Sequence, residues 1–236
     1  MSNHVSPCPS VPAAVLWDMD GTIVDTEPYW VECEYEVIAR HGNGAWSQAH
    51  VERLVGSDLL EAAGYMIEHG DLTLGPVEVV NLLLDGVIER VKAHIPWRPG
   101  ARELLAELNE QAVPCALVTM SWRRFAQAIV AALPPGSFAT VVAGDDVERG
   151  KPHPDPYLVA AERLGVSAAE CVAIEDSPTG VRSAVAARCI TIGVPNVVGI
   201  PPDLGHVPLD TLDGVSVGTL ARIVDGVTTT RRPSSA

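Results

Sequence analysis

Short, unbroken apolar runs recur along this chain, separated by longer segments in which apolar residues return every three or four positions. The runs are partly β-branched, as expected of strands that are buried on both faces of a sheet. They are Ala13–Trp17, Cys115–Val118, Val141–Ala143, Cys171–Ile174 and Cys189–Gly193. From residue 100 onward, helical patterns alternate with these runs, at Ala101–Asn109, Trp122–Leu133, Pro156–Leu164 and Pro178–Ala187. Alternating strands and helices predict a parallel sheet with right-handed crossovers.

The alternation is interrupted between Thr26 and about Pro96, where no strand-like run occurs. Three helical patterns fill this interval, at Trp30–Arg40, Leu59–His69 and Val77–Lys92, and they predict a helical cap inserted after the first strand. We therefore expect an α/β core over residues 11–26 and 96–225, a helical cap over 27–95, and loose termini at 1–10 and 226–236.

The composition and net charge of the chain restrict the kinds of binding partner and the environment that we expect for the protein. The 236 residues carry a formal net charge of -14, which argues against nucleic acid or an anionic membrane surface as a partner. The apolar runs are far shorter than the roughly 20 residues of a membrane helix, and no leader pattern opens the chain, so we expect a soluble, cytoplasmic protein. Five scattered cysteines indicate neither a disulfide framework nor a zinc site. The oligomeric state is left open.

The most informative segment is Asp18-Met19-Asp20-Gly21-Thr22, directly after the first apolar run. Alone, such a segment is also compatible with an ordinary acidic turn. However, three later strand ends carry polar groups as well, namely Thr119, Lys151 and the pair Glu175-Asp176. The carboxyl ends of parallel strands converge on one edge, where ligands bind in open α/β sheets. Clustered carboxylates without clustered His or Cys favour Mg²⁺, which would also offset the charge of an anionic substrate.

Four segments in this order, DMDGT, Thr119, GKPHPDPY and EDSPTG, resemble the motifs of haloacid dehalogenase-like hydrolases. The helical stretch after DMDGT resembles the cap of the subgroup that includes β-phosphoglucomutase and phosphoglycolate phosphatase. The resemblance extends from about Val11 to about Ile200. It implies a Rossmann-like parallel-sheet core with an inserted α-helical cap.

The resemblance also implies a role for each motif residue. Asp18 would attack phosphorus and become an aspartyl-phosphate, and Asp20 would act as general acid and then as general base. The phosphoryl oxygens would be held by Thr119 and Lys151, together with backbone N–H groups of Met19, Asp20 and Met120. Mg²⁺ would be held by Asp18, Asp176, Glu175 and the backbone carbonyl of Asp20. The expected substrate is a small phosphorylated metabolite, of the sugar phosphate or phosphoglycolate type.

Other activities within this superfamily would require different residues from those of a phosphatase. A dehalogenase lacks an acid at the position of Asp20, and a phosphonoacetaldehyde hydrolase needs a cap lysine, whereas this chain has only Lys92 and Lys151. A β-phosphoglucomutase-like sugar phosphate mutase stays open, although the mutase cap loop has an arginine where this chain reads Val-Gly-Ser-Asp at 55–58. Arg53 lies nearby, and Arg53 and Ser57 are candidate substrate contacts.

Two alternative functions are not enzymatic. A phosphate- and metal-binding signalling module, such as a response-regulator receiver, has similar residues in a different order and in about half this length. A catalytically silent binding protein on the same fold would be expected to lack Asp18, Asp20 or Lys151, and all three are present. The sequence therefore favours a Mg²⁺-dependent phosphatase.

Overall fold

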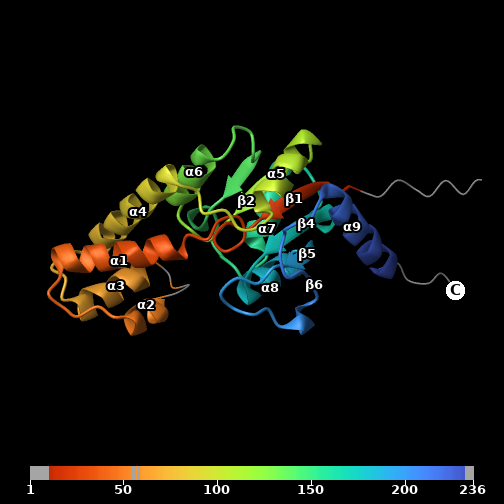
Figure 1. The fold of residues 1–236 in the computed structure, drawn as a ribbon. Helices are drawn as coiled ribbons and strands as arrows, with labels where there is room; N and C mark the ends of the chain where they lie inside the picture. Colours follow the sequence, from red (N-terminus) through yellow and green to blue (C-terminus); the bar gives the residue numbers. More distant parts are fainter. Residues whose placement is uncertain (1–10, 55–56, 58, 232–236) are drawn as a thin grey trace, which may run out of the picture. The chain divides into compact units, whose positions relative to one another are not determined.

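The structure is a computed structural model that describes residues 11–54, 57 and 59–231, and this part of the chain forms two compact units (Figure 1). The divisions fall between Val24 and Asp25 and between Pro96 and Trp97. We call residues 11–24 with 97–231 the core unit, and residues 25–96 the inserted unit.

A parallel sheet forms the centre of the core unit, with the described strands in the order β3-β2-β1-β4-β5-β6. The strands are β1 (Ala14–Trp17), β2 (Cys115–Val118), β3 (Thr140–Val142), β4 (Cys171–Glu175), β5 (Ile190–Gly193) and β6 (Val207–Pro208). The chain builds the sheet outward from β1 on one side and then returns to continue from β4 on the other. The topological switch point therefore lies between β1 and β4, which is where such sheets bind ligands.

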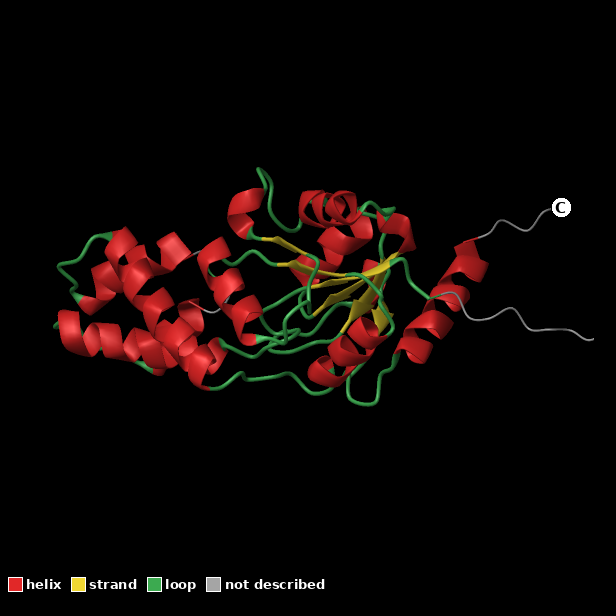
Figure 2. Cartoon of the chain, turned by 90° about the horizontal axis from the view of Figure 1, so that it is seen from above, coloured by secondary structure: helices red, strands yellow, loops and turns green. Residues whose placement is uncertain are grey.

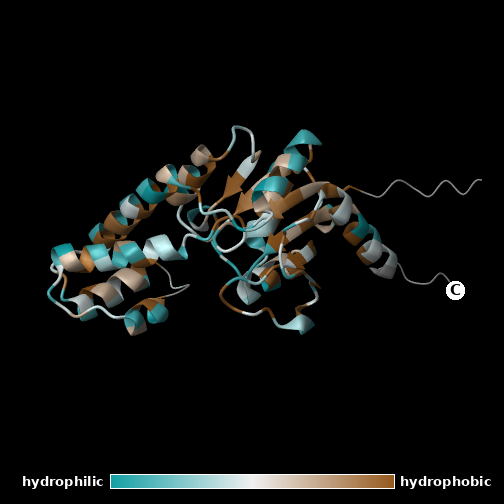
Figure 3. Cartoon of the chain, in the orientation of Figure 1, coloured by the Kyte–Doolittle hydropathy of each residue, from teal (hydrophilic) through white to brown (hydrophobic). Residues whose placement is uncertain are grey.

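Helices cover both faces of this sheet (Figure 2), and the strands are strongly apolar (Figure 3). On one face Ala14 and Leu16 of β1 belong to a core cluster with Tyr157 and Ala160 of α7 (Asp155–Leu164) and with Ala184 of α8 (Pro178–Ala186). Burial on both faces explains why the strands read as unbroken apolar runs and not as alternating ones. The predicted Rossmann-like α/β class is confirmed.

The other described helices of the core unit are α5 (Ala101–Glu110), α6 (Arg123–Ala132) and α9 (Val217–Arg231), with short 3₁₀ turns at Gly144–Asp146, Ala168–Glu170 and Pro202–Leu204. The cap of α8 matches the sequence signal, since Ser177 Oγ accepts a hydrogen bond from the Gly180 N–H. Neither β6 nor α9 was predicted. None of the helices within the described ranges has the length and apolar character needed to cross a bilayer.

The predicted loose C-terminus from residue 226 is wrong over 226–231, because α9 continues to Arg231. The helix persists because Leu220, Ala221 and Val224 bury an apolar face. The Thr228 hydroxyl also donates to the Val224 carbonyl at 2.7 Å. The remaining residues of the predicted loose ends, 1–10 and 232–236, lie outside the described residues.

The inserted unit is helical, as expected, and consists of α1 (Glu27–His41), α2 (Gln48–Leu54), α3 (Leu59–Gly70) and α4 (Pro76–Ala93) in its described part. Helix α4 packs against both α1 and α3 and buries a row of aliphatic residues that includes Val80, Leu83 and Val87. Helix α2 was not predicted. It is short and mostly polar, and it buries only Val51 and Leu54, so no apolar periodicity marks it in the sequence.

One acid, Glu34 on α1, lies in the interior of the inserted unit and is 8% exposed. Burial and, to a smaller extent, the Glu27 carboxylate raise the pKa of Glu34 to about 7, although Trp46 opposes this shift. Between the unfolded value of 4.5 and about 7, the folded protein keeps a proton that the unfolded chain releases. The contribution of Glu34 to folding stability therefore decreases as the pH rises through this window.

We expect Glu34→Gln to be more stable than the wild type at pH 8 by roughly 2–3 kcal/mol, and the difference to vanish toward pH 4.5. Thermal unfolding of both proteins across this pH range measures the effect. Glu68→Gln, at an exposed position of the same unit, is the matched control and should follow the wild type. A difference between Glu34→Gln and wild type that is constant with pH would contradict this account of Glu34.

Candidate active site

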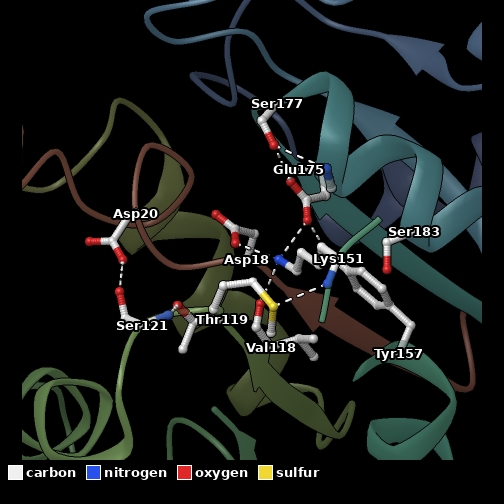
Figure 4. Close-up of polar contacts among 12 residues, drawn as sticks. Asp18, Asp20, Val118, Thr119, Ser121, Lys151, Tyr157, Glu175, Ser177 and Ser183 are labelled. Atoms are coloured by element: carbon white, nitrogen blue, oxygen red, sulfur yellow. Dashed lines mark hydrogen bonds and ion pairs between the residues drawn. The ribbon is translucent and has the colours of Figure 1, made fainter. Parts of the chain in front are cut away.

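Three neighbouring strands end in polar residues at the same edge of the sheet (Figure 4). Asp18 directly follows β1, Thr119 directly follows β2, and Glu175 is the last residue of β4 with Asp176 next in the chain. Since β1 pairs with both β2 and β4, these residues are brought together from distant parts of the sequence. Asp18, Thr119 and Glu175 are all buried, with at most 8% of the residue exposed.

Lys151 lies at the centre of this group. Its ammonium Nζ donates to Asp18 Oδ1 at 2.6 Å, to Glu175 Oε1 at 2.7 Å and to the Val118 carbonyl at 2.9 Å. Burial opposes the charge of Lys151, but the two carboxylates hold its pKa above the usual range. The side chain is therefore a buried cation aimed at the carboxylate of Asp18, and it is not an ordinary surface lysine.

Glu175 is held on both carboxylate oxygens. Besides Lys151, Oε1 accepts a hydrogen bond from the Tyr157 hydroxyl at 2.5 Å, and Oε2 accepts one from Ser177 Oγ at 3.4 Å. A Cβ atom at Gly180 would lie 1.9 Å from Oε2, so only glycine leaves room for the carboxylate there. Sequence reasoning missed Tyr157, although it lies within the GKPHPDPY segment; a tyrosine at a helix start carries no specific signal.

Asp18, Glu175 and Asp176 form an acidic triad, in which one carboxylate oxygen from each lies within 4.8 Å of the others. Burial, together with the nearby carboxylates of Asp18 and Glu175, raises the pKa of Asp176 to about 8, although the Lys151 ammonium opposes this shift. Gly21 has a left-handed φ of +86°, and a Cβ there would lie 2.1 Å from Asp176 Oδ2. Three crowded carboxylates against one ammonium leave a deficit of positive charge, which a hard divalent cation with oxygen ligands would fill.

The remaining predicted motif residues lie on the two loops that follow β1 and β2. Met19 is fully buried, and its carbonyl accepts from the Ile23 N–H at 3.0 Å, which closes the turn after β1. Met120 Sδ accepts from the Lys151 backbone N–H at 3.1 Å. The Asp20 carboxylate is directed toward Ser121, whose hydroxyl donates to Oδ2 at 2.7 Å (Figure 4). Ser121 is a second residue that the sequence alone did not single out.

Arg53 and Ser57, the candidate substrate contacts, both belong to the inserted unit. Arg53 is an exposed residue near the end of α2, and the Ser57 hydroxyl donates to its carbonyl at 3.5 Å. The other residues of the predicted cap loop, Val55, Gly56 and Asp58, lie outside the described residues. Substrate contact by Arg53 and Ser57 stays a prediction.

Comparisons with known proteins agree with this arrangement. The family model described as haloacid dehalogenase-like hydrolase matches residues 15–194. Hexitol phosphatase A of Escherichia coli is 31% identical over 222 residues, which are 93% of this chain and 94% of that protein. Fructose-1-phosphate phosphatase of the same species is 35% identical over 196 residues, covering 77% of this chain and 96% of that protein.

Among solved structures, CbbY from Rhodobacter sphaeroides in complex with phosphate is similar, with a TM-score of 0.75 and 25% identity. The superposition covers 89% of this chain and 99% of that one. The resemblance found in the four sequence motifs is confirmed. The chain belongs to the haloacid dehalogenase-like hydrolase family.

Proposed function

We propose that this protein is a Mg²⁺-dependent phosphatase that hydrolyses a small phosphomonoester through an aspartyl-phosphate on Asp18. The observation that carries the proposal is the position of the Asp18 carboxylate. It lies at the topological switch point, 2.6 Å from the Lys151 ammonium and within the acidic triad. A carboxylate that is both paired with a buried cation and adjacent to a divalent-cation site can approach an anionic phosphoryl group.

The substrate class is proposed from the relatives. Hexitol phosphatase A and fructose-1-phosphate phosphatase are named for phosphate esters of a polyol and of a sugar, and each aligns with most of this chain. We therefore propose a phosphorylated sugar or polyol, with phosphoglycolate as a smaller candidate, since phosphoglycolate phosphatase is also among the relatives.

The metal would be held by Asp18 and Asp176, with Glu175 as a third ligand or as a group that orients one. The donor set fits Mg²⁺, because it offers only hard oxygen atoms. The raised pKa of Asp176 fits as well, because burial among like charges is relieved when a divalent cation is present. When bound, Mg²⁺ would reduce the repulsion between the phosphoryl oxygens and the carboxylates around them.

The protein's own groups would then divide the chemistry into two steps. In the first, an Asp18 oxygen forms a bond to phosphorus while the ester P–O bond breaks, and Asp20 protonates the departing alkoxide. In the second, Asp20 takes a proton from water, the water oxygen bonds to phosphorus, and the bond between phosphorus and Asp18 breaks to release inorganic phosphate. Lys151 and the Thr119 hydroxyl would hold the phosphoryl oxygens as their charge redistributes.

The proposal predicts that phosphate release from a panel of sugar, polyol and glycolate phosphomonoesters depends on Mg²⁺. Chelation with EDTA should lower turnover by about 100-fold or more, and excess Mg²⁺ should restore it, because the acidic triad repels the substrate without the cation. Inorganic phosphate and the dephosphorylated product are both measured. Turnover that is unaffected by chelation would contradict the metal requirement. Conversion of a hexose 1-phosphate to the 6-phosphate without phosphate release would indicate a mutase instead.

A further inference from the structure

The hydrogen bond between Ser121 and Asp20 joins two loops that occupy equivalent places on neighbouring strands. Asp20 is the third residue after β1, and Ser121 is the third residue after β2. The pairing of β1 with β2 brings the loops together, and the Ser121 hydroxyl donates to Asp20 Oδ2 at 2.7 Å (Figure 4). The contact therefore connects Asp20, two residues after the proposed nucleophile Asp18, to the loop that follows β2.

Ser121 is itself held from both sides. Its backbone N–H donates to Thr119 Oγ1 at 3.0 Å, and its carbonyl accepts from the Gly144 N–H at 3.0 Å. Thr119 is 1% exposed, so the first of these contacts ties the loop to the buried end of β2. A Cβ atom at Gly144 would lie 2.3 Å from the Met120 carbonyl, which shows how closely the two segments approach. The loop that presents the serine hydroxyl is thus fixed by hydrogen bonds at both the N–H and the carbonyl of Ser121.

We propose that Ser121 is a positioning residue that holds the Asp20 carboxylate in the rotamer needed for proton transfer. The inference rests on the proposed function, in which Asp20 is the acid and base. An aspartate on a loop samples several staggered rotamers, and proton transfer is efficient only when the carboxylate stays within hydrogen-bond reach of the reacting oxygen. A serine hydroxyl has one hydrogen, and here Asp20 accepts it, so the hydroxyl is not at the same time a donor to a phosphoryl oxygen.

The role can be separated from phosphate binding by comparing the first and later turnovers of p-nitrophenyl phosphate. p-Nitrophenolate departs with little need for a proton, whereas hydrolysis of the aspartyl-phosphate requires a base to take a proton from water. Ser121→Ala should therefore leave the first release of p-nitrophenol close to wild type and slow the later turnovers by about 10-fold or more. Ser121→Thr, which keeps the hydroxyl, should restore most of the rate.

A double-mutant cycle with Asp20→Asn supplies the second readout. If Ser121 acts through Asp20, Ser121→Ala should cause no further loss of rate in the Asp20→Asn background. The inference is overturned if Ser121→Ala matches the wild type. It is also overturned if Ser121→Ala slows first and later turnovers equally, or if it costs the same factor with and without Asp20, because Ser121 would then serve the phosphoryl group. Wild-type protein without phosphatase activity would instead refute the proposed function.

Discussion

Asp18→Asn should lose phosphatase turnover almost completely, by at least about 10³-fold in kcat, while the fold is retained. The amide has nearly the shape of the carboxylate and keeps one oxygen for the Lys151 ammonium, which lies 2.6 Å from Asp18 Oδ1. It is, however, a far weaker nucleophile, and it lacks the charge that a phosphoryl acceptor and a metal ligand need. The loss should therefore appear in turnover far more than in the amount of folded protein.

Two measurements make the expectation specific. Mass spectrometry after rapid acid quenching should find a phosphoryl group on the Asp18 peptide of the wild type during turnover, and none on the variant. Asp203→Asn, a substitution of the same kind at an exposed position, is the matched control and should retain wild-type turnover. A phosphoryl group trapped on a different residue, or an active Asp18→Asn protein, would show that Asp18 is not the acceptor.

Replacing Lys151 should affect stability and activity together. Its side chain is 5% exposed, and the Asp18 and Glu175 side chains that it pairs with are 11% and 1% exposed. Lys151→Met keeps the aliphatic stem but leaves both carboxylates buried without their cation. Removing one partner of a buried ion pair costs about 3–5 kcal/mol, so we expect a loss of this size in the metal-free protein by denaturant unfolding. Turnover should fall by about 100-fold or more, because the phosphoryl oxygens lose a charged donor.

Arg149→Met provides the contrast. Arg149 lies two residues before Lys151 in the sequence and also pairs with a carboxylate, that of Asp155, but its side chain is 61% exposed. Exposed pairs contribute at most about 1 kcal/mol, so this variant should stay close to wild type in stability and turnover. Combining Lys151→Met with Glu175→Gln removes one of the uncompensated charges. The double variant should regain part of the stability and none of the activity. Equal effects of Lys151→Met and Arg149→Met would mean that the buried ion pair has no special role.

The fold could be predicted largely because its sheet is buried on both faces. The strands β1, β2 and β4 each contain an unbroken apolar run, and the residue that follows the run at the carboxyl edge is polar, namely Asp18, Thr119 and Glu175. Elements without that signature were missed. Strand β6 has only two residues and ends in a proline, and α9 contains Gly and Thr residues that weaken its helical pattern.

The sequence predicted the charged residues of the candidate site, but it did not predict the hydroxyl-bearing residues that hydrogen-bond to them. Asp18 and Asp176 stand out because charges at the ends of buried strands are costly unless they are used or paired. Lys151 stands out because the chain has only one other lysine, although it lies in the loop between β3 and α7 and not at a strand end. Ser121 and Tyr157 carry no such signal, since hydroxyl-bearing residues occur throughout loops and helix starts. Their contacts with Asp20 and Glu175 depend on rotamers and on the register of neighbouring elements, which a single sequence does not specify.

The ion pair between Lys151 and Asp18 joins residues 133 positions apart, and Glu175 is a further 24 positions along the chain. Contacts of such long range form late, because the entropy of closing large loops must be overcome before they are gained. During synthesis, Asp18 emerges long before the lysine and the acids that complete its surroundings. In a nascent or half-folded chain Asp18 is therefore an ordinary solvated carboxylate, and the proposed phosphoryl transfer would become possible only when β4 has joined β1. The proposed catalytic competence would in this sense be a property of the completed sheet.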